Sequence, residues 1–178
     1  MAWDNDLEKS MSHFDKYVRP VLPSLLRGEY ISVEGRVEEI AKLLDQQVGI
    51  DLMLKHKDLF YGIGSRIQFG DKAWNTFTIR CERESGHRTE YEKLKAAISS
   101  GAMRPSYTIH AYVNNDKLIS LGCAKTKDIV EWIDANPKIT RKSQDEKGWA
   151  NFYVASWYSM RQQGYPVKIF DGRRGCVV

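Results

Sequence analysis

Asp51 is the residue whose type and surroundings most strongly suggest chemistry. It stands in the apolar segment from Ile50 to Leu54, which the residue types predict to be a β-strand. Burying a carboxylate is costly unless it is paired, hydrogen-bonded or bound to a metal ion. The position therefore predicts a dedicated partner for Asp51.

Polar residues that could supply this partner occur on the neighbouring predicted elements. Glu34 lies near the core-facing edge of the predicted helix that precedes Asp51. Arg66 and Gln68 are two positions apart and share one face of the next predicted strand, and Arg80 lies on the strand after that. If these strands are adjacent, the five side chains form one polar cluster.

Such a cluster offers ligands to a hard divalent cation. Mg²⁺ takes carboxylate and amide oxygens and keeps several waters, which makes Asp51, Gln68 and Glu34 its candidate ligands, with Mn²⁺ as the substitute ion. A water activated by the metal could be a nucleophile. Arg66 or Lys72 would stabilise negative charge on a phosphodiester transition state.

A structural interpretation of the same residues stays open. Asp51 could form a salt bridge with Arg66 or Arg80 at the end of its strand. Gln68 could face solvent on a hairpin, and Glu34 could be a solvated carboxylate in the first turn of a helix, where the helix dipole favours it.

Two basic stretches could contact phosphates. The first alternates with glutamates between positions 82 and 92, a mixture that is also typical of a solvated face. The second lies among the aromatic residues of the C-terminal region, which could stack on bases or simply fill a core. The candidate nucleic-acid contacts are Arg80, Arg83, Arg88, Lys142, Arg173 and Arg174.

Hydrophobic periodicity and turn signals predict the elements that position these residues. One or two short helices are expected within 6–26, and residues 138–148 are polar and loop-like. The residue types of 151–159 suit a strand or a helix equally. The predicted order is helix 33–48, strands 50–54, 60–69 and 75–80 as an antiparallel meander, a helix from Thr89 to Gly101, strands 107–113 and 118–123, a helix from Thr126 to Pro137, and a last strand 167–170. This order predicts a three-layer α/β sandwich with a mixed central sheet.

Length and composition exclude several classes. The 178 residues, 42% of them hydrophobic, suit a single domain over 1–178, with a core at about 32–135 and a β- and aromatic-rich extension at about 136–178. No apolar run approaches the length of a membrane helix, and the acidic N-terminus lacks a signal-peptide core, so a cytoplasmic protein with no membrane partner is expected. The three cysteines are widely separated, which argues against a zinc site or a disulfide framework.

The residues from about Ser32 to Val113 resemble the PD-(D/E)XK, or restriction-endonuclease-like, nuclease superfamily. The resemblance is carried by Glu34, by the segment from Val48 to Asp51, and by the segment from Ser65 to Gln68. It implies an α-β-β-β-α-β core, with Asp51 as the invariant metal ligand, Gln68 as the second ligand and Glu34 as the helix acid. The sequence departs from the motif at Gly70, where the family has lysine.

The leading hypothesis is a Mg²⁺-dependent endonuclease that hydrolyses phosphodiester bonds in DNA. Because Gly70 replaces the motif lysine, the alternative is a catalytically inactive protein on the same fold that binds nucleic acid or a protein partner, such as a defence, anti-defence or phage accessory factor. A small-molecule enzyme with a polar pocket is a third, weaker hypothesis. The sequence leaves the oligomeric state open, a homodimer included.

Overall fold

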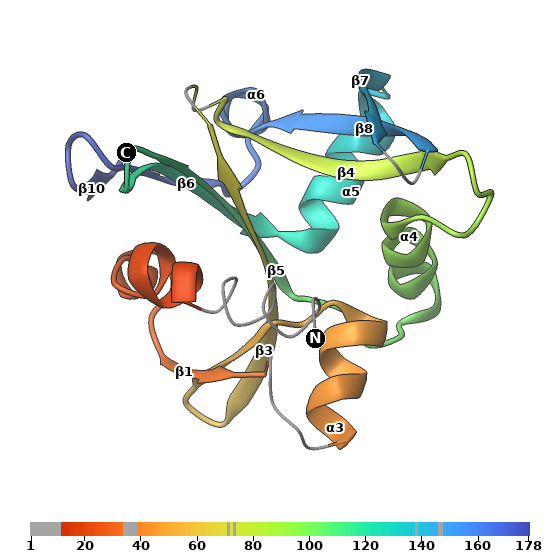
Figure 1. Cartoon of the computed structure of the whole chain (residues 1–178). Helices are drawn as coiled ribbons and strands as arrows, with labels where there is room; N and C mark the ends of the chain where they lie inside the picture. The colour runs from red at the N-terminus through yellow and green to blue at the C-terminus, as the bar shows by residue number, and fades with distance from the viewer. Residues whose placement is uncertain (1–11, 34–38, 71, 73, 138, 146–147) are drawn as a thin grey trace.

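The computed structural model describes residues 12–33, 39–70, 72, 74–137, 139–145 and 148–178. Glu34 lies outside them. The chain forms a mixed α/β fold with a strongly twisted seven-stranded sheet, a smaller three-stranded sheet, and helices packed against them (Figure 1).

The large sheet has the strand order β1-β2-β3-β5-β6-β9-β10. Its neighbours are antiparallel except β3 and β5, which are parallel. The sheet is therefore mixed, as expected. Its strands are β1 (Glu29–Ser32), β2 (Leu52–His56), β3 (Leu59–Phe69), β5 (Tyr107–Asn114), β6 (Lys117–Lys125), β9 (Lys168–Asp171) and β10 (Cys176–Val177).

The parallel pair is joined by a crossover that contains helix α4 (Glu90–Ser100). Thr89 caps this helix: its hydroxyl accepts from the backbone of Glu92, and the Glu92 carboxylate accepts from the backbone of Thr89. Gly101 ends the helix in the left-handed conformation, at φ 69°. The capping box and the terminal glycine confirm the sequence prediction for this element.

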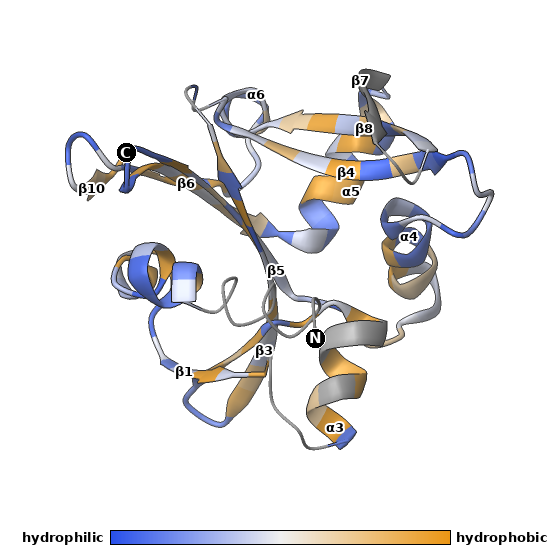
Figure 2. Ribbon diagram, in the orientation of Figure 1, coloured by the Kyte–Doolittle hydropathy of each residue, from blue (hydrophilic) through white to orange (hydrophobic). Residues whose placement is uncertain are grey.

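The two faces of the large sheet bury separate cores. On one face, residues of β3, β5 and β6 such as Ile63, Ile109 and Leu121 pack against the N-terminal helices η1 (Phe14–Val18) and α2 (Leu22–Leu25). On the other face lies a core that includes Phe77, Ile129 and Trp157, formed with the small sheet and helices α5 (Thr126–Ala135) and α6 (Trp157–Gln162). The apolar side of α5 faces this second core (Figure 2).

Strand β4 (Thr76–Arg83) does not extend the meander of β2 and β3, so the predicted adjacency of three consecutive strands is wrong. Both edges of β3 are already paired, with β2 and with β5. Strand β4 instead pairs with β8 (Gly148–Ser156), which pairs with β7 (Ile139–Asp145). The small sheet then covers the face of the large sheet, because burial of Phe77 and Ile79 requires a partner surface.

The C-terminal region differs most from its prediction. Residues 139–145 form strand β7 and are not a loop, because β8 supplies a pairing edge that local residue preferences do not reveal. The ambiguous segment is a strand followed by helix α6, which Ser156 caps. Strand β1 was not predicted. Within 33–48, the described helical residues are α3 (Glu39–Lys42) and η2 (Leu43–Val48).

The three cysteines are free thiols, as their wide separation in the sequence predicts. Burial raises the pKa of Cys123 to about 12, so this thiol stays protonated at neutral pH. Among the described residues, no helix is both long enough and apolar enough to cross a membrane.

Gly122 on β6 provides a direct test of how the second core is packed. A Cβ built on Gly122 would overlap the indole ring of Trp157, which is fully buried. We expect Gly122→Ala to lower the free energy of unfolding by about 1–3 kcal/mol in denaturant titrations. Gly70→Ala is the matched control, because a Cβ at Gly70 meets nothing within 4 Å. Equal stability of the two variants would contradict this packing.

Candidate functional site

Two adjoining hollows lie where β3, β4, α4 and the segment before β2 meet. Their volumes are about 170 and 330 Å³, and both are lined by Gly49, Arg66 and Glu90. Asp51 and Ser65 line only the smaller hollow. Arg80, Arg83, Arg88 and Lys93 line only the larger one. We call the two hollows together the Arg66 cleft.

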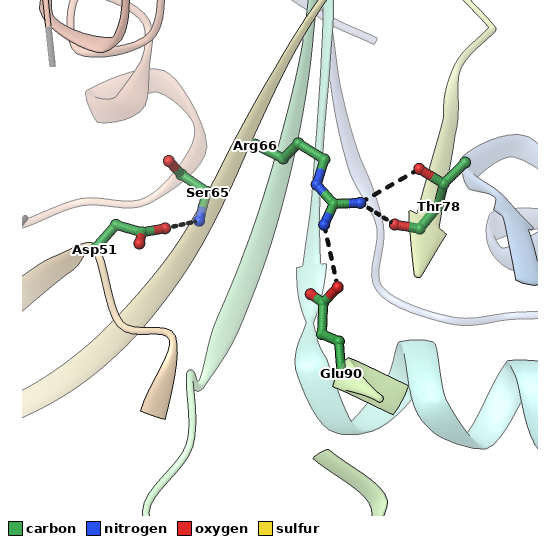
Figure 3. Close-up of polar contacts among 5 residues, drawn as sticks. All are labelled: Asp51, Ser65, Arg66, Thr78 and Glu90. Atoms are coloured by element: carbon green, nitrogen blue, oxygen red, sulfur yellow. Dashed lines mark hydrogen bonds and ion pairs between the residues drawn. The ribbon is translucent and has the colours of Figure 1, made fainter. Parts of the chain in front are cut away.

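Asp51 directly precedes β2, and its backbone is hydrogen-bonded on both sides. Its amide donates to Ile63 at 2.9 Å, and its carbonyl accepts from Val33 at 2.9 Å. The carboxylate is turned toward β3, where it accepts a hydrogen bond from the backbone amide of Ser65 (Figure 3). The partner expected for this half-buried carboxylate thus includes a backbone N–H group.

Arg66 joins three elements. Its guanidinium donates to the Thr78 carbonyl on β4 at 2.6 Å and forms an ion pair with Glu90 of α4 at 3.1 Å. Figure 3 shows the side chain extending toward Thr78 and Glu90, while Asp51 is turned toward Ser65. The carboxylate that pairs with Arg66 is therefore Glu90, a residue that the sequence reasoning placed on a solvated face.

Glu90 reaches the cleft because of where α4 begins. The capping box at Thr89 makes Glu90 the first residue of the helix, which begins after the turn that follows β4. A residue at a helix start that follows a strand can lie at the sheet surface. The capping box was visible in the sequence, so it is the signal that could have pointed to Glu90.

His110 lies opposite Arg66 in the ladder between β3 and β5. The residue is fully buried, and its ring meets that of Phe77 edge to face at 6.0 Å between centroids. Burial, reinforced by the positive charge of Arg66, lowers the pKa of His110 to about 3. The imidazole is thus neutral at physiological pH and adds no charge to the site.

The cations around the larger hollow differ in how they are held. Arg83 donates to the carbonyls of His87 and Arg88 at 2.7 and 2.6 Å, so it closes the turn between β4 and α4. Arg80 is exposed, and its guanidinium lies 5.6 Å from the ring centroid of Phe152. Arg88 and Lys93 are exposed on the rim. Arg80, Arg88 and Lys93 can therefore reach a ligand.

The other predicted site residues lie elsewhere. Gln68 is on the same face of β3 as Arg66 but is not among the residues lining the Arg66 cleft, and in register it faces Tyr112 on β5. Lys72 and Arg173 line a different hollow, and Arg174 is in the turn between β9 and β10. Glu34 and the side chain of Lys142 are outside what the structure describes.

The donor set of the cleft fits a Mg²⁺ ion that is mostly hydrated. Asp51 and Glu90 both line the smaller hollow, and a carboxylate is the kind of side chain that Mg²⁺ binds. Mg²⁺ is commonly bound through one or two carboxylates, waters and substrate phosphates. The described residues contain no group of three acidic, histidine or cysteine side chains that could enclose a metal ion.

Comparison with known proteins does not assign the chain to a family. No protein-family model, curated protein or solved structure matches the chain.

The neutral state of His110 predicts how stability depends on pH. Its folded-state pKa, about 3, lies below its ordinary value of 6.5, so the unfolded chain binds the proton more tightly. The stabilisation from keeping His110 neutral is fully present above about pH 6.5. It is lost as the pH falls toward 3, and the free energy of unfolding then falls by on the order of 1 kcal/mol per pH unit. We expect His110→Phe to flatten this part of the stability profile, measured by denaturant titration at several pH values.

His87→Asn is the matched control, since His87 is exposed. The readout is the slope with pH, so a general loss of stability from repacking around residue 110 does not imitate it. An unchanged slope in His110→Phe would show that the imidazole is not held neutral.

Proposed function

We propose that the protein is a Mg²⁺-dependent nuclease that binds DNA in the Arg66 cleft and hydrolyses its phosphodiester bonds. The observation that carries the proposal is the meeting of exposed cations with two carboxylates in one cleft. Arg80, Arg88 and Lys93 line its larger hollow, Asp51 lines the smaller one, and Glu90 lines both. Cations bind phosphates, and carboxylates hold the metal ion that phosphoryl transfer commonly uses.

The proposal includes a restriction-endonuclease-like core in the large sheet, without β4, which belongs to the small sheet. Strands β2 and β3 are antiparallel, and β3 is followed by α4 and the parallel strand β5. The small sheet is then an insertion between β3 and α4 that is completed by β7 and β8 from the C-terminal region. Asp51 directly precedes β2, next to β3, which is where the resemblance requires an acidic residue.

The proposed role of each residue follows from its position in the cleft. Arg80, Arg88 and Lys93 would bind the phosphates of the strand. Arg66 orients Glu90 through their ion pair and adds positive charge near a bound phosphate. A Mg²⁺ ion held by Asp51 and Glu90 would polarise a phosphoryl oxygen as a Lewis acid. In this proposal the second metal ligand is Glu90 and not Gln68.

A second candidate is a catalytically inactive protein that binds nucleic acid through the same cleft. It is favoured by Gly70 at the position of the motif lysine, and by Arg66, which stays charged and cannot serve as a base. Both candidates require the cationic rim. Only the nuclease requires Asp51.

Cleavage assays separate the two candidates. Linear, supercoiled and single-stranded DNA and RNA would be incubated with wild type in Mg²⁺, Mn²⁺ or EDTA. We expect cleavage of DNA that EDTA abolishes, and a loss of about 100-fold or more in Asp51→Asn, because the metal would lose a negatively charged ligand. Asp58→Asn is the matched control, an exposed carboxylate in the turn between β2 and β3.

Equal rates for wild type and Asp51→Asn would contradict the assignment of Asp51. Binding of DNA without cleavage, unchanged by EDTA and by Asp51→Asn, would establish the inactive binding protein instead.

The cationic rim has its own test, independent of catalysis. Because each phosphate contact contributes about 0.9 to the slope of log affinity against log salt, replacing Arg88 and Lys93 with alanine should reduce that slope by about 2. Fluorescence anisotropy with a labelled duplex in EDTA measures it. The control double variant, Lys117→Ala with Lys127→Ala, removes the same charge from exposed positions outside the cleft. Equal slopes for the two double variants would remove the rim from the binding surface.

A further inference from the structure

A second hollow of about 490 Å³ lies outside the Arg66 cleft and shares no lining residue with it. Its volume is within the range of small-molecule sites. Four segments build it: the residues before β4, the middle of β6, the first turn of α6, and the turn after β9. Its lining residues are Lys72, Trp74, Asn75, Ile119, Ser120, Tyr158, Asp171 and Arg173. We call it the Trp74 hollow.

Two exposed aromatic rings line this hollow. Trp74 is 60% exposed and Tyr158 is 45% exposed, which is unusual for side chains whose burial is favourable. Trp157, the neighbour of Tyr158, is fully buried, so the first turn of α6 buries one aromatic ring and leaves the other exposed. Exposed rings beside a hollow provide flat surfaces on which a planar ligand can stack.

Two cations lie beside these rings. The Lys72 ammonium is 5.7 Å from the centroid of the Trp74 ring. Arg173 is exposed, and the structure records no ion pair for its guanidinium within the described part of the chain. The nearby Asp171 carboxylate accepts from the backbone amides of Arg173 and Arg174 at 2.9 and 3.4 Å, so the turn itself holds that negative charge. The cations remain able to bind an anion.

Ser120 gives an independent indication of a ligand. The residue lines the hollow and is 5% exposed, and its buried hydroxyl has no hydrogen-bond partner among the described residues. It faces Asp171 in the ladder between β6 and β9. An unpaired buried hydroxyl costs free energy, and a polar group of a bound ligand would recover part of it.

From these features we infer that the Trp74 hollow binds a nucleotide, with the base stacked on Trp74 or Tyr158, the phosphate held by Lys72 and Arg173, and a base or sugar polar group near Ser120. Stacking on aromatic rings combined with cationic contacts to phosphate is the usual chemistry of unpaired nucleotides. The nucleotide could be free or part of a single strand. The inference does not depend on cleavage in the Arg66 cleft.

Isothermal titration of the full chain tests the inference. The probes are deoxyadenosine monophosphate, deoxyadenosine, inorganic phosphate and a single-stranded dA hexamer. We expect the monophosphate or the hexamer to bind at least tenfold more tightly than deoxyadenosine or phosphate alone, because base and phosphate are recognised together. Equal binding of monophosphate and hexamer identifies a free-nucleotide site, and binding of the hexamer alone identifies an unpaired nucleotide of a strand.

Variants locate the binding. Trp74→Ala and Arg173→Ala should each weaken it about tenfold, while Trp74→Phe keeps a stacking surface and most of the affinity. Phe60→Ala is the control for an exposed aromatic ring, since Phe60 is 56% exposed and outside the hollow, and Lys127→Ala is the control for charge.

Arg88→Ala keeps this test separate from the proposed nuclease. It should leave binding of the monophosphate unchanged, and a loss of binding in that variant would place the nucleotide in the Arg66 cleft and overturn the inference. Failure of all four probes to bind, or equal affinities for wild type, Trp74→Ala and Arg173→Ala, would also overturn it. A protein without cleavage activity would leave this result standing.

Discussion

The contacts of one guanidinium connect the parts of the fold that form the cleft. Arg66 extends from the large sheet, donates to the Thr78 carbonyl on the small sheet, and pairs with Glu90 at the start of α4. The pair is partly exposed, so its Coulomb energy is small, but the hydrogen bond to Thr78 gives it a fixed direction. The cleft has its shape because these three elements meet at Arg66.

The separation of the two sheets is a consequence of strand pairing. Strand β3 uses both of its edges, so β4 can bury Phe77 and Ile79 only by lying over the sheet and recruiting β8 as its own partner. This arrangement places Arg80, Arg83 and the start of α4 above the large sheet. It also leaves the residues before β4 at a distance from the cleft, which is why Lys72 contributes to another hollow.

The charges in the cleft are arranged in two zones. Asp51 lines the smaller hollow, Arg80, Arg88 and Lys93 line the larger one, and Glu90 lines both. Burial and the nearby Arg66 keep His110 neutral, so it adds no charge to either hollow. Such zoning is compatible with a polyanion that approaches the rim and presents one phosphate to the carboxylates, as the proposed nuclease requires.

Features that depend on near neighbours could be predicted from the residues alone: the capped helix that begins after Thr89, the long strand β3, the mixed α/β class, and Asp51 as a carboxylate that needs a partner. Three others follow from how distant segments pack: Ser65 is one of the partners of Asp51, Glu90 pairs with Arg66, and residues 139–145 form a strand. Helix caps and alternation act over a few residues, whereas Thr76 pairs with Ser156 and Arg66 with Glu90 through contacts between distant segments. Which segments meet depends on the packing of the whole chain, and local residue preferences carry no record of it.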